Sequence, residues 1–249
     1  MGAKADHPPP DLRDQLERER SHAGRILETN EENWGWSTPA GRIRWRRRVD
    51  FLLDGARDGC KRVLEIGAGT GTFTGALRAA PGRLYALDVA ESLLAVAKGR
   101  AEGVPLICAD AHRLPFPDEV FDAVLGCSVL HHLRWDLAVA EFGRVLRRGG
   151  TLRFSEPNLW NPQIFLQKKI PALKRMMGDS PDESAFTART ISRHLREAGF
   201  DRVDVRPYEF LHPSTPSSLI PAVERLESWI MATPLRRFGG SLAIDARRG

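Results

Sequence analysis

Between residues 61 and 156, short apolar segments alternate with segments of helical spacing, and this alternation restricts the possible folds more than any other feature of the chain. The apolar segments are KRVLEI, RLYALD, VPLICAD, FDAVLGC and GGTLRFSE. Strands that are apolar along their whole length and alternate with helices are typical of a parallel sheet covered on both faces. Right-handed crossovers between such strands predict a doubly wound α/β sandwich.

The flanking parts of the chain predict fewer elements. Trp45, Val49, Leu52 and Ala56 lie at helical spacing and predict an amphipathic helix before the first strand, whereas residues 11–30 are mostly charged and predict a solvated helix. After Pro157 the alternation stops and an irregular segment follows. A helix, a strand, a helix and a strand are then predicted at residues 187–199, 200–211, 219–230 and 239–248.

Composition restricts the class of protein but not its partner. The chain is 42% hydrophobic and 28% charged, which is typical of a globular protein with a full core. No apolar segment is long enough to span a bilayer, and the N-terminal residues lack the apolar region of a secretory signal, so we expect no membrane insertion. Cys60, Cys108 and Cys127 lack metal-ligand spacing, and we expect reduced, mostly buried thiols and a cytoplasmic location. The net charge of +5 suits a nucleic acid, an anionic membrane or an acidic small molecule alike.

A glycine-rich turn follows the first predicted strand. Gly67, Gly69 and Gly71 allow the backbone to approach a ligand closely. The Lys and hydroxyl of a P-loop are absent, and the third glycine comes one position too early for the dinucleotide fingerprint G-x-G-x-x-G. Asp88 ends the second strand, where its carboxylate can accept both hydroxyls of a ribose. This position is compatible with both NAD and S-adenosylmethionine.

Glu65 precedes the first glycine by two residues and separates these two cofactors. A carboxylate beside the turn suits a cationic group such as the ammonium of a methionine moiety, and it would repel a pyrophosphate. The pattern E-x-G-x-G-x-G after the first strand resembles motif I of the class I S-adenosylmethionine-dependent methyltransferases. The resemblance covers residues 60–156 strongly and residues 187–248 loosely.

The resemblance implies a cofactor site, with S-adenosyl-L-methionine as methyl donor and S-adenosyl-L-homocysteine as product. Beside Glu65 and the three glycines, Asp88 lies where the family binds the ribose. Asp110 lies where the family binds the adenine amino group, and the backbone N–H of Ala111 faces the ring. Val89 and Cys127, at the ends of the second and fourth strands, complete the expected set. An isolated Asp110 is also compatible with a helix cap.

Candidate catalytic residues follow the fourth and fifth strands. A sulfonium activates the methyl group, so the protein must hold the acceptor in line and, for a hydroxyl, remove a proton. His131 and His132 follow the fourth strand at the edge where open α/β sheets bind ligands, and Glu156 ends the fifth. The pair resembles that of small-molecule O-methyltransferases, which implies either histidine as general base with Glu156 orienting it. Both histidines are equally compatible with a capping or packing role.

Together these features predict a doubly wound, seven-stranded, mostly parallel Rossmann-like sheet with an antiparallel last strand and helical lid insertions. Residues 1–30 are expected to be a flexible or helical extension, and residues 31–249 a single methyltransferase domain. Within that domain we expect a lid helix at 31–58 and acceptor-pocket insertions at 157–186 and 211–233. Arg44 to Arg48 form either a solvated face of the lid helix or a contact to an anionic or glycosidic acceptor.

The predicted function is methyl transfer to a small-molecule acceptor, by preference to a hydroxyl of a natural product or sugar. N- or C-methylation of a small metabolite is the alternative. A nucleic-acid methyltransferase is disfavoured because the segment after the fourth strand is GCSVLHHL and lacks an Asn/Asp-Pro-Pro-aromatic motif. No residues are spaced as metal ligands, so we expect no metal. The sequence does not indicate the acceptor or the oligomeric state.

Overall fold

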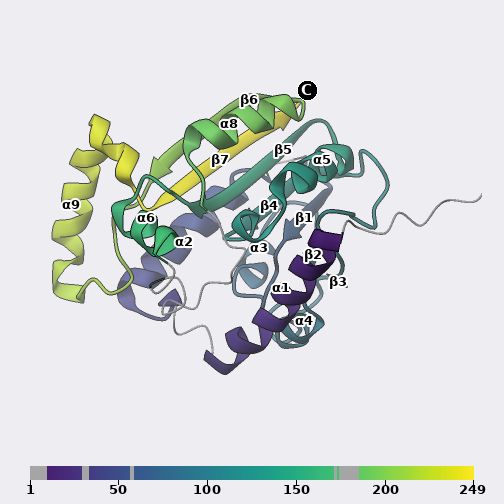
Figure 1. Ribbon diagram of the computed structural model, residues 1–249, viewed down its shortest axis with the longest axis horizontal. Coiled ribbons are helices and arrows are strands. Elements are labelled where there is room, and N and C mark those ends of the chain that lie inside the picture. The colour runs from purple at the N-terminus through teal and green to yellow at the C-terminus, as the bar shows by residue number, and fades with distance from the viewer. Residues whose placement is uncertain (1–9, 30–33, 57–58, 171–172, 174–184) are drawn as a thin grey trace, which may run out of the picture.

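The computed structural model describes residues 10–29, 34–56, 59–170, 173 and 185–249. Its centre is a seven-stranded sheet in the order β3-β2-β1-β4-β5-β7-β6 (Figure 1). β7 runs antiparallel to both of its neighbours, and the neighbouring strands from β3 to β5 pair in parallel. The predicted fold is therefore confirmed. The strands, in chain order, are Arg62–Ile66, Arg83–Asp88, Leu106–Cys108, Phe121–Cys127, Leu146–Pro157, Phe200–Tyr208 and Ser241–Arg248.

Helices cover both faces of the sheet, as the apolar strands require. Alternate residues of β1 show the two faces: Val63 packs toward Leu52 and Leu77, while Leu64 belongs to the cluster that contains Phe142. The first face is covered by α2 (Pro39–Leu53), α3 (Thr74–Leu77) and α4 (Glu91–Ala97). The second is covered by α5 (Trp135–Val145) and α8 (Ala188–Glu197), which lie in front of the sheet in Figure 1.

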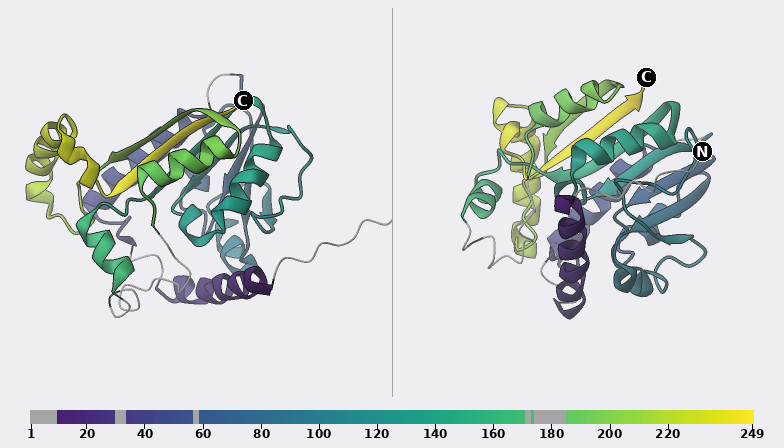
Figure 2. Two further views of the ribbon diagram at one scale, coloured as in Figure 1. Left: turned by 45° about the horizontal axis from the view of Figure 1, so that its top comes forward. Right: turned by 45° about the vertical axis from the view of Figure 1, so that its right-hand side comes forward.

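The remaining elements lie outside these two layers. In Figure 2 a group of them gathers at the end of the molecule that carries the start of β7. The elements outside the two layers are α1 (Pro10–Thr29), η2 (Leu130–His132), α6 (Pro162–Lys169), η3 (Ser217–Leu219), α9 (Ile220–Met231) and η4 (Pro234–Phe238). Of these, the short helix η2 links β4 to α5.

Helix α1 differs from the solvated helix predicted for this segment. Leu12 and Ala23 are buried, and Ala23 packs against Ala90 and Leu93 beside α4. The cause is an apolar stripe within the charged sequence, since residues 12, 16, 23, 26 and 27 recur at helical spacing. The extension therefore packs against the body of the protein, as Figure 1 also shows.

Two other expectations differ in detail. The fifth strand is predicted as GGTLRFSE, whereas β5 begins three residues earlier, at Leu146, and its pairing with β4 carries an irregularity between Phe121 and Ala123. The thiols are not mostly buried: Cys108 is exposed and the other two cysteines are half-buried. Cys108 is exposed because β3 is an edge strand. Within the described residues, no helix is long and apolar enough to cross a membrane.

The proposed domain boundaries remain a prediction. The described part of the lid helix is α2, and α9 lies within the second predicted insertion. Residues 1–9, 30–33, 57–58, 171–172 and 174–184 belong to the segments named above and lie outside the described residues.

Candidate functional site

The carboxyl ends of β1, β2, β3, β4 and β5 meet at one edge of the sheet, and a cavity of about 440 Å³ lies there. Because β7 runs in the opposite direction, its first residue reaches the same edge, and Ser241 lines the cavity. Residues of α1, α2 and α6 complete the wall. Ligands of open α/β sheets bind at this edge.

The glycine turn after β1 forms part of this wall, and each glycine has a different reason for lacking a side chain. A Cβ on Gly67 would lie 2.5 Å from a methyl group of Val129, and one on Gly71 would lie 3.1 Å from the Cα of Ala97. A Cβ on Gly69, in contrast, would meet no protein atom within 4 Å. Gly67 and Gly69 line the cavity, so their backbone is open to a ligand.

Asp88 lies at the end of β2 and holds the turn in place. Its Oδ2 accepts a hydrogen bond of 2.8 Å from the backbone N–H of Gly69, and its Oδ1 accepts one of 2.9 Å from Ala90. Burial raises the pKa of the Asp88 carboxyl above its ordinary value. Asp88 and Val89 line the cavity, as does Cys127 at the end of β4, where burial raises the thiol pKa to about 11.

Glu65 lies behind the turn. Its side chain is 2% exposed, and its Oε2 is buried without a hydrogen-bond partner. Burial raises the pKa of this carboxyl to about 8, so the neutral form predominates at pH 7. Glu65 itself does not line the cavity, although the adjacent Ile66 does. Gly71 does not line it either, so two of the expected cofactor residues, Glu65 and Gly71, lie outside the cavity wall.

Asp110 follows β3 and is tied to His112. Its Oδ1 lies 2.6 Å from Nδ1 of His112 and accepts the backbone N–H of the same residue at 2.9 Å. Burial alone would raise the Asp110 pKa, but the hydrogen bonds from His112 outweigh it and lower the pKa. Nε2 of His112 accepts the backbone N–H of Arg134, so Nδ1 carries the proton. Both residues line the cavity, together with Ala111.

The structure brings His131 and Glu156 together. Nδ1 of His131 lies 2.7 Å from Oε2 of Glu156, and both side chains are buried. The other oxygen, Oε1, accepts the backbone N–H groups of Val129 and Leu130, each at 2.9 Å. Glu156 is thereby fixed by two backbone donors and holds the imidazole in one orientation. His131 lines the cavity from η2, as expected for a residue after the fourth strand.

His132 has a different environment. Its Nδ1 lies 3.0 Å from Oε2 of Glu19, and its carbonyl accepts a hydrogen bond of 2.7 Å from Gln15. Both partners belong to α1, and both line the cavity with His132 and His22. None of these α1 residues is predicted from the sequence to belong to the site. The apolar stripe of α1 was the available signal, because it shows that the helix packs against the body.

Two arginines of α2 also belong to the cavity wall, so the face from Arg44 to Arg48 is not simply solvated. Arg48 is 3% exposed, and both Arg44 and Arg48 line the cavity. Both form ion pairs with Glu209, at 2.9 and 2.7 Å. Each guanidinium also lies over the Trp36 ring, at 5.5 and 5.2 Å from its centroid. No sequence pattern indicated Glu209, because only the pairing of β6 with β7 in the sheet brings it next to Arg44 and Arg48.

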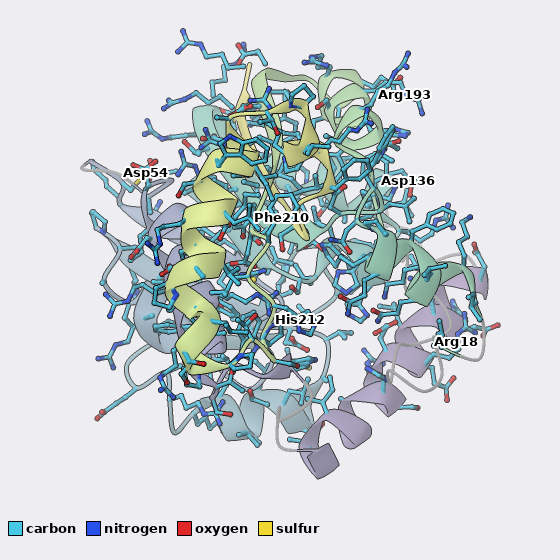
Figure 3. All side chains as sticks on the ribbon, turned by 90° about the vertical axis from the view of Figure 1, so that its left-hand side faces the viewer. Arg18, Asp54, Asp136, Arg193, Phe210 and His212 are labelled. Atoms are coloured by element: carbon cyan, nitrogen blue, oxygen red, sulfur yellow. The ribbon has the colours of Figure 1, made fainter. Side chains whose placement is uncertain are left out.

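The segment after Glu209 leads from β6 to α9. The backbone N–H of Phe210 donates to Glu227 of α9, and His212 lies further along the same segment (Figure 3). Burial and the charge of Arg44 lower the pKa of His212. The residues that contribute to this end of the site thus come from segments far apart in the sequence.

Comparisons with known proteins identify the family. The family model described as a methyltransferase domain matches residues 64–154. A demethylmenaquinone methyltransferase of Streptomyces avermitilis is 30% identical over 177 residues, which cover 64% of this chain and 75% of the relative. The chain belongs to the class I S-adenosylmethionine-dependent methyltransferases. A ubiquinone/menaquinone biosynthesis C-methyltransferase of Chromobacterium violaceum is 32% identical over 181 residues, covering 64% of this methyltransferase and 74% of the relative.

Solved structures show the same fold. A methyltransferase of Thermotoga maritima, described as a possible histamine N-methyltransferase, has a TM-score of 0.68 at 21% identity and covers 92% of this methyltransferase and 99% of its own chain. The N-methyltransferase NodS of Bradyrhizobium japonicum, solved with S-adenosylhomocysteine, has a TM-score of 0.63 at 18% identity. That alignment covers 93% of this methyltransferase and 98% of NodS. At these identities the likeness concerns the fold alone.

The cofactor of this methyltransferase is S-adenosylmethionine, and the cavity fits it. The open space beside Gly69 admits a ligand to the backbone of the turn, and the Asp88 carboxylate faces the same space. In the part of the chain that the structure describes, no group of three or more His, Cys, Asp or Glu side chains is placed to hold a metal ion.

Proposed function

We propose that this methyltransferase transfers a methyl group to a hydroxyl of a small-molecule acceptor of natural-product or sugar type. The contact that supports this proposal is the buried His131–Glu156 pair, with 2.7 Å between Nδ1 and Oε2. A hydroxyl is a weak nucleophile until it loses its proton, whereas a neutral amine is nucleophilic enough to attack before it loses one. A histidine that a carboxylate holds at the carboxyl edge of the sheet can remove the hydroxyl proton.

The order of strands supports the same arrangement. The cofactor-side residues, which include Asp88 and Asp110, follow β2 and β3, while Ser241 and Glu209 lie at β7 and β6. His131 and Glu156 follow β4 and β5, between these two groups. The pair therefore occupies the middle of the edge, where a methyl donor bound on one side meets an acceptor bound on the other.

Each residue has a proposed role. S-adenosylmethionine supplies a methyl group that its sulfonium activates. Asp88 binds the ribose hydroxyls and the backbone of Gly67 and Gly69 contacts the methionine end. Asp110 and the N–H of Ala111 bind the adenine. Gly71, Val89 and Cys127 shape the rest of the cofactor pocket. Glu65 supports the glycine turn from outside the cavity. Nδ1 of His131 donates to Glu156, which leaves the lone pair on Nε2 to accept the hydroxyl proton. His132 positions α1 through Glu19 and Gln15.

C-methylation is the second candidate, and the names of two relatives favour it. The proteins of Streptomyces avermitilis and Chromobacterium violaceum are named as a demethylmenaquinone methyltransferase and a quinone-biosynthesis C-methyltransferase. Removal of a proton from a ring hydroxyl also activates the adjacent ring carbon, so the same histidine serves either outcome. A Methylococcus capsulatus relative is named as a malonyl-[acyl-carrier protein] O-methyltransferase, so O-methylation also occurs among the relatives.

The test is turnover with a panel of phenols, enols and sugars, measured as formation of S-adenosylhomocysteine. The methyl resonance of the product distinguishes O-, C- and N-methylation. We expect His131→Ala to lower kcat by about 10²–10⁴-fold, the range of general-base catalysis, with an unchanged Kd for S-adenosylhomocysteine. His132→Ala is the matched comparison and should affect kcat much less. Equal rates in His131→Ala and the unmodified protein would refute a base at this position.

A further inference from the structure

Acidic and basic side chains line different parts of the cavity, and among the acidic ones Glu19 lines it from α1. Asp88 and Asp110 follow β2 and β3 on one side of the sheet edge. Arg44, Arg48 and Lys168 line the cavity from α2 and α6, near the start of β7, and we call these three residues the basic wall. The hydrogen bond of 2.8 Å from Arg48 to Oγ of Ser241 connects the wall to β7. The basic wall thus lies on the acceptor side of the site.

The two arginines of the wall share a single carboxylate. Nε of Arg44 and Nη1 of Arg48 lie 2.9 and 2.7 Å from the same atom, Oε2 of Glu209. The other oxygen of Glu209 is buried without a hydrogen-bond partner, and so is Nε of Arg48. Two guanidinium charges against one carboxylate leave an excess of one positive charge at the cavity surface. Lys168 lines the same cavity.

Arg47 of the same helix shows the opposite balance. Its guanidinium bonds two carboxylates, those of Glu224 and Glu227 on α9, at 3.0–3.1 Å. Arg47 does not line the cavity. The arginine that only joins two helices therefore has an excess of acids, whereas the two arginines that face the cavity have an excess of positive charge.

Burial makes this excess costly. Arg48 is almost completely buried and its Nε has no hydrogen-bond partner, which is unfavourable, although nearby Tyr208 and Glu209 keep the pKa of Arg48 above its ordinary value. Burial and the charge of Arg48 lower the pKa of the Arg44 guanidinium in spite of its contact with Glu209. An anion in the cavity would relieve both effects. The contacts of both guanidiniums with Trp36 hold them side by side for such a ligand.

We propose that the acceptor carries an anionic group, a carboxylate or a phosphate, which binds to Arg44 and Arg48 while its hydroxyl reaches His131. The proposal extends the proposed function and rests on it for the position of the reacting atom. Guanidinium groups suit this role because their planar donors match the oxygens of both anions. Neutral analogues of the acceptor would leave the excess charge of Arg44 and Arg48 uncompensated.

Binding of small probes to the protein saturated with S-adenosylhomocysteine tests the proposal. Benzoate, phenyl phosphate and neutral benzamide share a phenyl ring, and calorimetry gives the Kd of each. We expect at least one anion to bind ten or more times more tightly than benzamide, and the stronger anion identifies the group. Arg44→Gln should weaken anion binding at least tenfold without changing the Kd of S-adenosylhomocysteine. Arg46→Gln removes the same charge from an exposed position of α2 and should change neither.

Arg44→Lys keeps the charge and loses the planar donors, so it should bind the anion with intermediate affinity, and it serves if the Gln variant does not fold. Equal affinities for the anions and benzamide, absence of anion binding, or equal effects of Arg44→Gln and Arg46→Gln would overturn the proposal. The proposed function would fail differently, through kcat values of His131→Ala that match those of the unmodified protein. The probe experiment involves no methyl transfer, so the two failures are distinguishable.

Discussion

The backbone N–H of Gly69 donates a hydrogen bond of 2.8 Å to Oδ2 of Asp88, so the turn after β1 and the end of β2 hold each other in position. The same carboxylate accepts the N–H of Ala90. One side chain therefore fixes the two backbone segments that a ligand at this edge must contact.

Replacement of this carboxylate should affect ligand binding strongly. Asp88→Ala removes the proposed partner of the ribose hydroxyls and the acceptor of two backbone N–H groups. A hydrogen bond to a charged group contributes about 1.5–3 kcal/mol, so the loss of even one of them should raise the Kd of S-adenosylhomocysteine about 10- to 100-fold. Calorimetry gives this Kd directly. Asp136→Ala is the control and should leave the Kd unchanged, because Asp136, labelled in Figure 3, forms an exposed ion pair with Arg134.

Two glycines offer a matched test of the open space in the turn. Gly69 and Gly149 both have positive φ, 53° and 72°, and a Cβ on either would meet no protein atom within 4 Å. Replacement by alanine should therefore lower the free energy of unfolding by a similar amount, about 1–2 kcal/mol, at both positions. Only Gly69→Ala places a methyl group in the cavity, so only this variant should bind S-adenosylhomocysteine more weakly. Equal Kd values for both variants would show that the ligand does not approach Gly69.

Glu65 predicts a dependence of stability on pH. Because its pKa is about 8 in the folded protein and near 4.5 otherwise, the folded state retains a proton that the unfolded chain loses. Its stabilising contribution is complete below pH 4.5 and is lost as the pH rises through about 8. One pKa unit corresponds to about 1.4 kcal/mol, so the loss amounts to a few kcal/mol.

The measurement is Tm at pH 5.5 and pH 9 for the unmodified protein and Glu65→Gln. The Gln variant lacks the titrating group, so its Tm should fall less between the two pH values. Glu102→Gln, at an exposed position, provides the reference for loss of a surface carboxylate. A parallel fall of Tm in Glu65→Gln and the unmodified protein would contradict a raised pKa at Glu65.

Glu156→Gln should change the tautomer of His131, the proposed base. Its carbonyl can still accept the N–H groups of Val129 and Leu130, but its amide then points toward Nδ1 of His131. Nδ1 becomes an acceptor, and the proton moves to Nε2, which can no longer take one from a hydroxyl. We expect a decrease in kcat of about 10²–10⁴-fold at constant cofactor Kd. Glu19→Gln, beside His132, should have a smaller effect on kcat, and the reverse ranking would favour His132 as the base.

The parallel strands and the cofactor turn were predictable because they depend on local patterns. An apolar strand, a glycine turn and an acid at the next strand end are each visible within a few residues, and the parallel sheet brings such segments to one edge. Asp88 and the His131–Glu156 pair follow from this rule. The position of Glu65 outside the cavity wall does not follow from this rule. Neighbouring residues of a strand point to opposite faces, and the sequence does not show which face meets the ligand.

The acceptor side was harder to predict because its residues meet only in the folded chain. Glu209 is 165 positions from Arg44 and joins it through β6, whose neighbour in the sheet is β7. Arginines on an amphipathic helix are ordinarily solvated. That Arg44 and Arg48 are instead partly or fully buried becomes visible only when β6 and β7 are in place. The packing of α1 was predictable in principle from its apolar stripe, but its charged composition obscured that stripe.

The position of β7 between β5 and β6 also imposes an order of assembly. β6 precedes β7 in the chain, yet β6 forms all its ladder hydrogen bonds with β7 and none with β5. During synthesis β6 must therefore wait for a later segment, whereas β1 to β5 can pair as they emerge. Glu209 and Ser241 reach their places only when β7 inserts. A nascent chain thus completes the proposed methyl-donor half of this edge before the half proposed to bind the acceptor.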